Sequence, residues 1–243
     1  MKFIRLIIGL LLFSILGCQS PDSKIESTQN PTSDVKIVGA MKNVMWKGEL
    51  AAVIHLDTIK NKIGLYGLGP IDYLRGELMI VDGKSYVSRV LSDSTMKLEE
   101  TFDVQAPFFV YANNSNWTEE ILGDDINGIK DLENYISEAT KNKNRPFVFK
   151  LTGRIDEATI HIQNLAEGST VSSPEEAHRG QVNYHLGKSE VEIVGFFSTA
   201  HQGIFTHHDS YLHMHLITSD KMQMGHLDEV LFTKGEMKLF LPE

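Results

Sequence analysis

The sequence predicts an α+β domain built mostly from antiparallel or mixed β-sheets with a few helices, because strand-like runs outnumber helix-like ones. Asp82-Gly83, between two apolar runs, is the strongest hairpin signal, since a type I′ turn needs positive φ at both positions. Clear helical spacing of apolar residues occurs in 35–47 and 125–142. At 42% hydrophobic and 23% charged residues, the chain can bury a sizeable core.

Residues 1–17 are predicted to form a lipoprotein signal peptide. Two basic residues precede the apolar run 6–16, which is too short to span a membrane. The run ends at Cys18, the only cysteine, so no internal disulfide can form. This ending resembles a bacterial lipoprotein signal, which implies acylation of Cys18, attachment to a membrane through that lipid, and export. Gln19 after the cysteine favours the outer membrane, facing the periplasm or the cell surface. The alternative is an ordinary leader in which the cysteine stands by chance.

Residues 18–34 are predicted to form a flexible tether, because they are rich in Ser, Asp, Pro, Thr and Asn and contain one aliphatic residue, Ile25. The folded domain is therefore expected at 35–243. The formal net charge is -9 and no basic run occurs, which argues against a nucleic-acid partner.

The elements expected in this domain are mainly strands. The helix at 125–142 is predicted by an apolar stripe that includes Leu132 and Ile136, and the apolar stretch 48–57 fits a helical continuation of 35–47. Gly153 is expected to break one strand, and Gly187 to form the turn of a hairpin. The predicted strands are 77–81, 84–90, 98–102, 107–111, 147–152, 157–163, 182–186 and 190–197, with a polar loop at 164–180.

The segment 211–228 carries the strongest candidate for a functional site. Side chains alternate along a strand, so His213 and His215 are expected to share one face while the apolar residues between them enter a core. The polar, glycine-ended segment 219–225 predicts a hairpin connection, and the returning strand would bring His226 beside the first two. Three neutral imidazoles from two strands fit a zinc site whose fourth position is open.

Each histidine also has an ordinary explanation. A single histidine is more often a surface group or a satisfied core group than a metal ligand, and a pair at i, i+2 is still a weak signal. The third histidine behind a short turn, with an apolar opposite face, strengthens the metal interpretation. His201, His207 and His208 precede the strand and are interpreted as loop residues.

Four segments, in order over roughly residues 40–241, resemble the α-acetolactate decarboxylase family. The last is the most specific, because it keeps the family's His-x-His, ten intervening residues and a further His without a gap. The segments are KIGLYGLGPIDYLRGELMIVDG, RPFVFKLTG, VEIVGFFS and LHMHLITSDKMQMGHLDEV.

The resemblance implies a β-rich fold of two subdomains, a homodimer, and conversion of (S)-2-acetolactate to (R)-acetoin and CO2. It implies that His213, His215 and His226 hold Zn2+, with Glu77 as the carboxylate beside it. Zinc chelated by the substrate's hydroxyl and ketone oxygens would act as a Lewis acid for the charge left by CO2. Glu77 would handle the proton that returns to carbon. Without the resemblance, Glu77 would be interpreted as an exposed strand residue.

The chain also departs from the family pattern. Arg75 replaces an acidic residue before Glu77. Counting from the glycine after 147–152 places His161 where the family has an arginine that faces the site, and the nearest arginine is Arg154. The family continues past its last strand and returns a glutamate to the metal, whereas this sequence stops at Glu243, which would have to fold inward. Histidine offers at best one titratable donor to a carboxylate, where arginine offers a bidentate, permanently charged one.

Two functions remain open from the sequence. The first is an exported zinc-dependent carboxy-lyase acting on acetolactate or a similar hydroxy-keto acid, with Glu77 and His161 as catalytic residues. Arg75 or Arg154 could take the place of the family arginine. The second is an exported zinc-binding lipoprotein of the same fold with a changed substrate or no catalytic activity.

Overall fold

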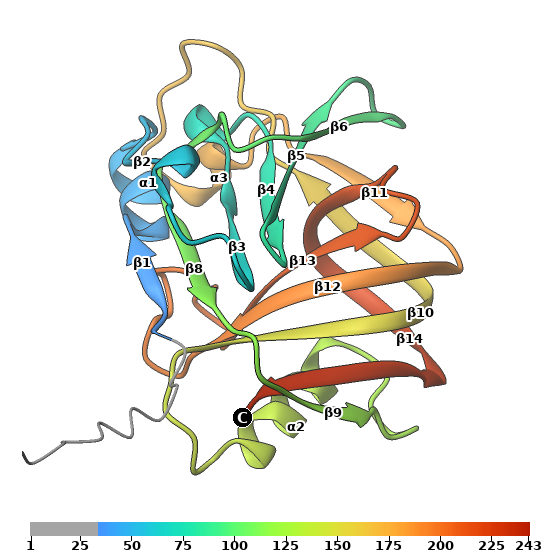
Figure 1. The fold of residues 1–243 in the computed structure, drawn as a ribbon. Helices are drawn as coiled ribbons and strands as arrows, with labels where there is room; N and C mark the ends of the chain where they lie inside the picture. The colour runs from blue at the N-terminus through green and yellow to red at the C-terminus, as the bar shows by residue number, and fades with distance from the viewer. Residues whose placement is uncertain (1–33) are drawn as a thin grey trace, which may run out of the picture. The chain divides into compact units, whose positions relative to one another are not determined.

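The computed structural model describes residues 34–243, whose strands form two six-stranded antiparallel sheets (Figure 1). The first sheet has the order β1 (Lys36–Val38), β8 (Phe109–Asn113), β3 (Leu65–Pro70), β4 (Glu77–Val81), β5 (Lys84–Val90) and β6 (Met96–Glu100). The second has the order β11 (Val182–Leu186), β10 (Phe147–Ile162), β12 (Ser189–Phe197), β13 (Leu212–Thr218), β14 (Met224–Pro242) and β9 (Trp117–Ile121). A further short pair joins β2 (Ile54–His55) to β7 (Gln105–Ala106). The predicted fold class is confirmed.

The helices are few and short. They are α1 (Met41–Lys47), α2 (Ile129–Ala139) and α3 (Pro174–Ala177), with 3-10 turns at Leu56–Thr58 and Asp72–Leu74. Within residues 34–243, no helix is both long enough and apolar enough to cross a bilayer. The predicted signal peptide at 1–17, Cys18 and the tether at 18–34, apart from its last residue, lie outside the described residues.

The prediction of a helix over 35–47 is wrong at its start. Residues Lys36–Val38 pair with β8, and Gly39 turns the chain at φ 68° before α1 begins. The expected helical continuation at 48–57 is also wrong, because the short strand β2 and the first 3-10 turn occupy its end. The predicted helix at 125–142 is confirmed in its central part, as α2.

The second sheet differs from prediction at Gly153 and at Gly187, and its edge strand β9 was not predicted. Gly153 does not end a strand: β10 runs through it for 16 residues, and the glycine takes a φ of 145° at a register shift against β14. An added Cβ there would lie 2.0 Å from the carbonyl oxygen of Glu236, so only glycine fits this irregularity. The predicted hairpin through Gly187 is wrong, since β11 and β12 do not pair with each other but lie in succession along β10. β10 is 16 residues long, so β11 and β12 can both pair with it, one after the other.

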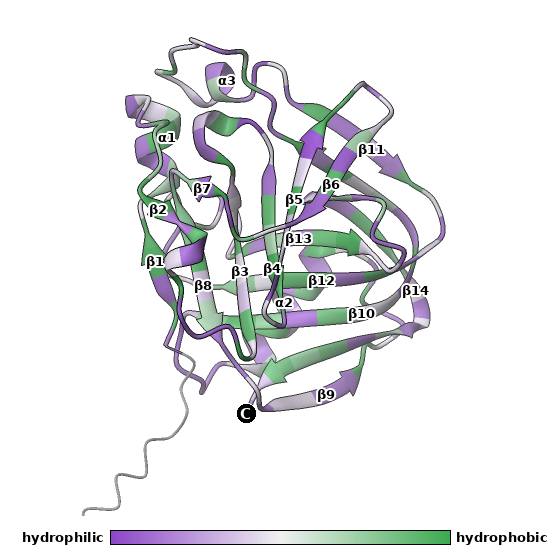
Figure 2. Ribbon diagram, turned by 45° about the horizontal axis from the view of Figure 1, so that its top comes forward, coloured by the Kyte–Doolittle hydropathy of each residue, from purple (hydrophilic) through white to green (hydrophobic). Residues whose placement is uncertain are grey.

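The strands of the two sheets cross at a steep angle, with an apolar core between them (Figure 1). Tyr66, Leu68 and Met79 of the first sheet meet Phe196 and Ile217 of the second in that core. The other face of the second sheet packs a larger core against α2. Figure 2 shows hydrophobic colouring along much of β12 and β13, whereas the edge strands β6 and β9 are more hydrophilic, which agrees with their partial exposure.

Candidate metal centre

Strand register brings three histidines into one row across the second sheet. His215 of β13 lies opposite His226 of β14, and His226 lies opposite His161 of β10. Directly paired residues share a face of the sheet, so the three side chains project to the same side. His213 is two residues before His215 and joins them on that face. The apolar residues that alternate with them, Leu212, Met214 and Leu216, enter the core on the opposite side, as the alternation predicts.

The predicted metal-binding histidines form a compact triangle. The ring centroids of His213 and His215 are 5.1 Å apart, those of His213 and His226 are 5.3 Å apart, and those of His215 and His226 are 5.4 Å apart. His161 stacks on His226 with a centroid distance of 4.5 Å. The four imidazoles are thus neighbours, although β10 lies about fifty residues before the hairpin of β13 and β14 in the sequence.

Asp228 connects two of these rings. The β14 register skips it, since Leu227 pairs with Ile160 and Glu229 pairs with Thr159. From this bulge its carboxylate accepts hydrogen bonds from Nδ1 of His161 at 2.8 Å and from Nδ1 of His226 at 3.1 Å. The donor atoms of His161, His226 and Asp228 all lie within 4.8 Å of one another, which makes them a second candidate cluster for a cation.

The two candidate clusters share His226, and its hydrogen bond distinguishes their roles. With its Nδ1–H donated to Asp228, the ring keeps a lone pair on Nε2, which points away from the carboxylate. A carboxylate that fixes the tautomer of a ligand histidine is the usual outer-shell arrangement in metal centres. Asp228 therefore fits better as the residue that orients His226 and His161 than as a metal ligand.

Glu77 lies at the floor of the same site, at the first residue of β4. Its side chain is only 4% exposed, and its Oε2 is 3.8 Å from Nε2 of His215. Its Oε1 accepts a hydrogen bond of 3.1 Å from the backbone N–H of Gln163, which follows β10. Burial raises the pKa of Glu77 well above the usual range of a glutamate. The carboxyl group can therefore hold a proton at a pH where an exposed glutamate would be ionised.

The donor set fits a divalent metal ion of the zinc type. Burial lowers the pKa of His213 and His215 well below the usual range of histidine, and also that of His226, so the rings are neutral and offer lone pairs. Both ring nitrogens of His215 and Nδ1 of His213 are buried without a hydrogen-bond partner among residues 34–243. Unpartnered polar atoms at such depth are costly, and a cation would satisfy those that face the cluster.

His207 also belongs to the histidine cluster, although from the sequence it was interpreted only as a loop residue. It does lie in the segment between β12 and β13, yet its Nε2 is 3.0 Å from Nε2 of His226. Burial and the neighbouring His226 lower the pKa of His207 to about 4. Asp228 was also missed, because its role depends on a bulge. The one available signal was the density of histidines, with three between residues 201 and 208.

A pocket of about 430 Å³ opens above the cluster. Glu77, His161, His213 and His226 lie at its polar end, and its apolar wall comes largely from α1 and its surroundings: Met41, Met45, Trp46, Pro70, Leu74 and Phe108. In the part of the chain that the structure describes, Lys42 is the only lysine or arginine that lines this pocket.

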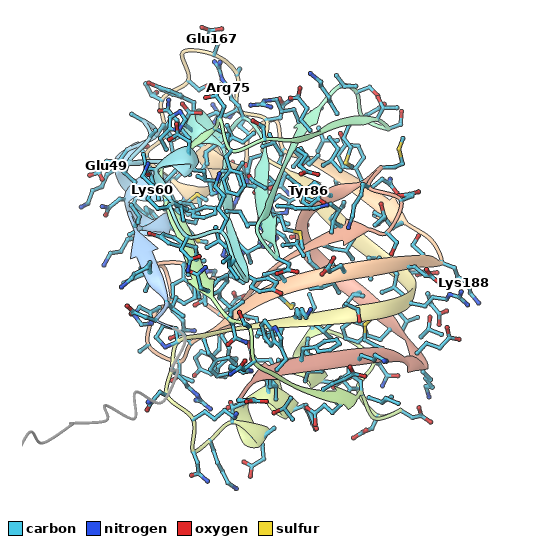
Figure 3. The ribbon with its side chains drawn as sticks, in the orientation of Figure 1. Glu49, Lys60, Arg75, Tyr86, Glu167 and Lys188 are labelled. Atoms are coloured by element: carbon cyan, nitrogen blue, oxygen red, sulfur yellow. The ribbon has the colours of Figure 1, made fainter. Side chains whose placement is uncertain are left out.

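Neither arginine considered as a replacement lines this pocket. Arg75 lies on the surface, where its guanidinium is 3.7 Å from Glu167 in the loop after β10; Figure 3 shows the pair at the edge of the molecule. Arg154 is bound to Glu190 and Glu236 at 3.4 and 3.3 Å. Glu243 is exposed after the end of β14, where its N–H reaches Asn116, and it is not among the pocket residues. Of His161, Arg75 and Arg154, only His161 lines the pocket.

Comparison with known proteins agrees with this architecture. The family model for alpha-acetolactate decarboxylase matches residues 37–241. The alpha-acetolactate decarboxylase of Lactococcus lactis subsp. cremoris (strain MG1363) is 23% identical over 180 residues, which cover 73% of this chain and 72% of the relative. The crystal structure of alpha-acetolactate decarboxylase from Bacillus subtilis strain 168 superposes with a TM-score of 0.70 at 22% identity, covering 86% of this chain and 85% of the other. A Staphylococcus aureus protein of unknown function, described as similar to alpha-acetolactate decarboxylase, gives a TM-score of 0.72 at 16% identity, with coverage of 86% and 85%. The match over residues 37–241 spans most of the sequence, and the chain therefore belongs to the alpha-acetolactate decarboxylase family.

Proposed function

We propose that this protein is a zinc-dependent carboxy-lyase that converts (S)-2-acetolactate, or a closely similar 2-hydroxy-3-keto acid, to (R)-acetoin, or the corresponding hydroxyketone, and CO2. The observation that carries the proposal is the buried carboxyl group of Glu77 beside three neutral histidines at the end of an open pocket. Family membership supports the same reaction.

His213, His215 and His226 would hold the metal ion, with Asp228 fixing the tautomer of His226. Zinc bound there would act as a Lewis acid toward the hydroxyl and ketone oxygens of the substrate. Because a hydrogen bond already holds the ligand histidine in place, the substrate can bind without a rearrangement of its ring.

Glu77 is proposed as the acid–base residue. When the carbon–carbon bond to the carboxylate breaks, CO2 leaves without the bonding electron pair, and the carbon that keeps the pair must gain a proton. Because burial raises the pKa of Glu77, its carboxyl group can carry that proton at a pH where an exposed glutamate would have lost it. The backbone N–H of Gln163 holds one carboxyl oxygen, which fixes the direction in which the other points.

His161 is proposed to meet the carboxylate of the substrate. Its Nδ1 is held by Asp228, so only Nε2 can face a ligand, where the side-chain nitrogen of Gln163 is 3.4 Å away. A neutral ring would present a lone pair there, and only an imidazolium would donate a hydrogen bond. Binding of a carboxylate by His161 would therefore be weaker than by the bidentate grip of an arginine.

Among the described residues no arginine lines the pocket, which favours a second candidate function. In that alternative, the protein is a zinc-binding lipoprotein of the same fold with a changed substrate or no catalytic activity. The deciding experiment is an assay of the full-length protein, purified in detergent and loaded with zinc, for acetoin and CO2 from racemic acetolactate. Chelator-treated protein is the control. Acetoin formed at the same low rate with and without metal would reject the lyase proposal.

We also propose that the protein is exported and attached to the outer membrane through a lipid on Cys18, and that it forms a homodimer. The expected result is that the wild type labels with fatty acid and sediments with membranes, whereas Cys18→Ser does neither. Unlabelled wild-type protein in the cytosolic fraction would contradict the attachment. Sedimentation equilibrium of the detergent-solubilised protein tests the dimer.

A further inference from the structure

His207 and His226 approach each other closely through their ring nitrogens. Its Nε2 is 3.0 Å from Nε2 of His226, and the two ring centroids are 4.9 Å apart. The direction of the His226 ring is set independently, because its Nδ1 is bound to Asp228. The nitrogen that faces His207 is therefore the one that carries the lone pair.

This contact has two chemical explanations. His207 could donate an Nε2–H hydrogen bond to His226, in which case the two rings satisfy each other and a metal ion would have to break the bond. Alternatively, both nitrogens could direct lone pairs at one cation between them. Two nitrogens bound to one tetrahedral zinc ion, each at about 2.0–2.1 Å, lie roughly 3.3 Å apart. The observed distance is close to this value, so coordination by both rings would need only a small adjustment.

The segment that carries His207 is well anchored. The carbonyl oxygen of His201 accepts hydrogen bonds from the N–H groups of Ile204 and Phe205, and the N–H of Gly203 donates to Thr206 at 2.8 Å. The Phe205 side chain is fully buried in the core between the sheets. Met41 of α1 donates its N–H to Ile204 at 2.8 Å, which ties the segment to the pocket wall. A ring fixed in this way can be presented to a metal ion at little further cost in conformational entropy.

We propose that His207 is a fourth histidine ligand of the metal centre, beside His213, His215 and His226. This inference rests on the proposed metal-binding function of the cluster. A zinc ion held by four protein ligands has no open position, whereas catalytic zinc keeps one. His207 would therefore have to yield its position to the substrate, or the ion would have to accept a fifth ligand.

The test compares four metal-stripped, full-length proteins: wild type, His207→Ala, His207→Gln and His185→Ala. Glutamine keeps an N–H donor for His226 but is a poor zinc ligand, so it separates hydrogen bonding from coordination. His185 is exposed, lies on β11 and bonds only Thr159 among the described residues, which makes it the matched control. Zinc affinity is measured by competition with a chromophoric chelator, and the ligand field by the visible spectrum of bound Co2+.

The expected result is a loss of zinc affinity of at least about tenfold in both His207 variants. Their Co2+ spectra should change, and free imidazole should restore the wild-type spectrum to His207→Ala. His185→Ala should match the wild type, and unfolding of the metal-free proteins should show that all four fold.

The competing explanation predicts the opposite sign. If His207 only donates a hydrogen bond to His226, its removal frees the lone pair, and His207→Ala binds zinc as tightly as the wild type or more tightly. That result would overturn the inference while leaving the proposed function standing. A wild-type protein that binds no metal would overturn both, so the two failures are distinguishable.

Discussion

Glu77 shows how a single residue acquires a chemical role from its surroundings. Its neighbours in sequence predict an exposed strand residue. The crossing of the two sheets instead buries Glu77 against His215. We expect Glu77→Gln to keep its bound metal while losing turnover of acetolactate by roughly a hundred- to ten-thousandfold, the usual contribution of an acid–base group. Steady-state kinetics and metal analysis on the same samples check both parts. Full turnover in the variant would remove Glu77 from the acid–base role.

Asp228 should matter to the metal without touching it. Asp228→Asn keeps the shape of the side chain but replaces one of the oxygens that accept hydrogen bonds from His161 and His226 with an N–H donor. We expect metal affinity to fall by about ten- to a hundredfold, as for other outer-shell partners of ligand histidines. Calorimetric titration with Zn2+ measures this. Asp156→Asn is the control and should leave the affinity unchanged, because Asp156 is half-buried elsewhere on β10, where it bonds Thr233.

Sequence spacing identified part of the site, and its limits have physical causes. His213, His215 and His226 could be placed together because strand alternation and a short hairpin are local rules. Glu77 and His161 were reached through the family resemblance, since both lie far away in sequence. His207 and Asp228 were not found, because one depends on the path of a loop and the other on a bulge, and neither has a periodic signal.

At the level of elements, the contact between β10 and β14 builds the site, and Gly225 sets how closely the strands approach. An added Cβ at Gly225 would lie 2.5 Å from the carbonyl oxygen of His161. We therefore expect Gly225→Ala to push β14 away from β10, destabilise the protein by about 1–3 kcal/mol, and weaken metal binding. Gly187→Ala is the control, because nothing lies within 4 Å of an added Cβ there. Denaturant unfolding and zinc titration of both variants measure the two effects.

The same strands explain which parts of the fold the sequence could predict. Hairpin β4–β5 has a local signal, and its Asp82-Gly83 turn has positive φ at both residues, as expected. The β11–β12 hairpin failed because the two strands pair with β10, and pairing between distant segments leaves no mark on the turn between them. Gly153 was interpreted as a strand end because a glycine that breaks a strand and one that permits a bulge look the same in sequence.

For the whole molecule, gathering neutral histidines in one interior should make the metal-free protein sensitive to acid. In the folded protein the pKa values of His213, His215 and His226 are lowered, and that of His207 is about 4. Below pH 6.5 the unfolded chain therefore protonates these histidines while the folded protein keeps them neutral. Stability from these groups is complete above that pH and is lost as pH falls. Glu77 acts in the opposite direction, because its raised pKa lowers the stability of the folded protein as pH rises above 4.5. The histidines outweigh this effect, since they are at least three groups and Glu77 is one. The depressed pKa of Asp228 matters only at lower pH.

Between pH 6.5 and 5.5 the unfolded chain therefore binds more protons than the folded protein, and each excess proton lowers the unfolding free energy by about 1.4 kcal/mol per pH unit. Urea unfolding of chelator-treated protein across this range should show the loss, and His215→Gln should reduce its slope by about one proton. His185→Gln, at an exposed site, should keep the wild-type slope. Saturating zinc should flatten the profile until the metal itself is displaced, because bound metal stabilises the folded state by an amount that grows with the logarithm of its affinity. A metal-free protein whose stability is constant from pH 7.5 to 5.5 would mean that the histidine cluster is solvated and can take up protons freely, and such a cluster could not present a set of neutral ligands.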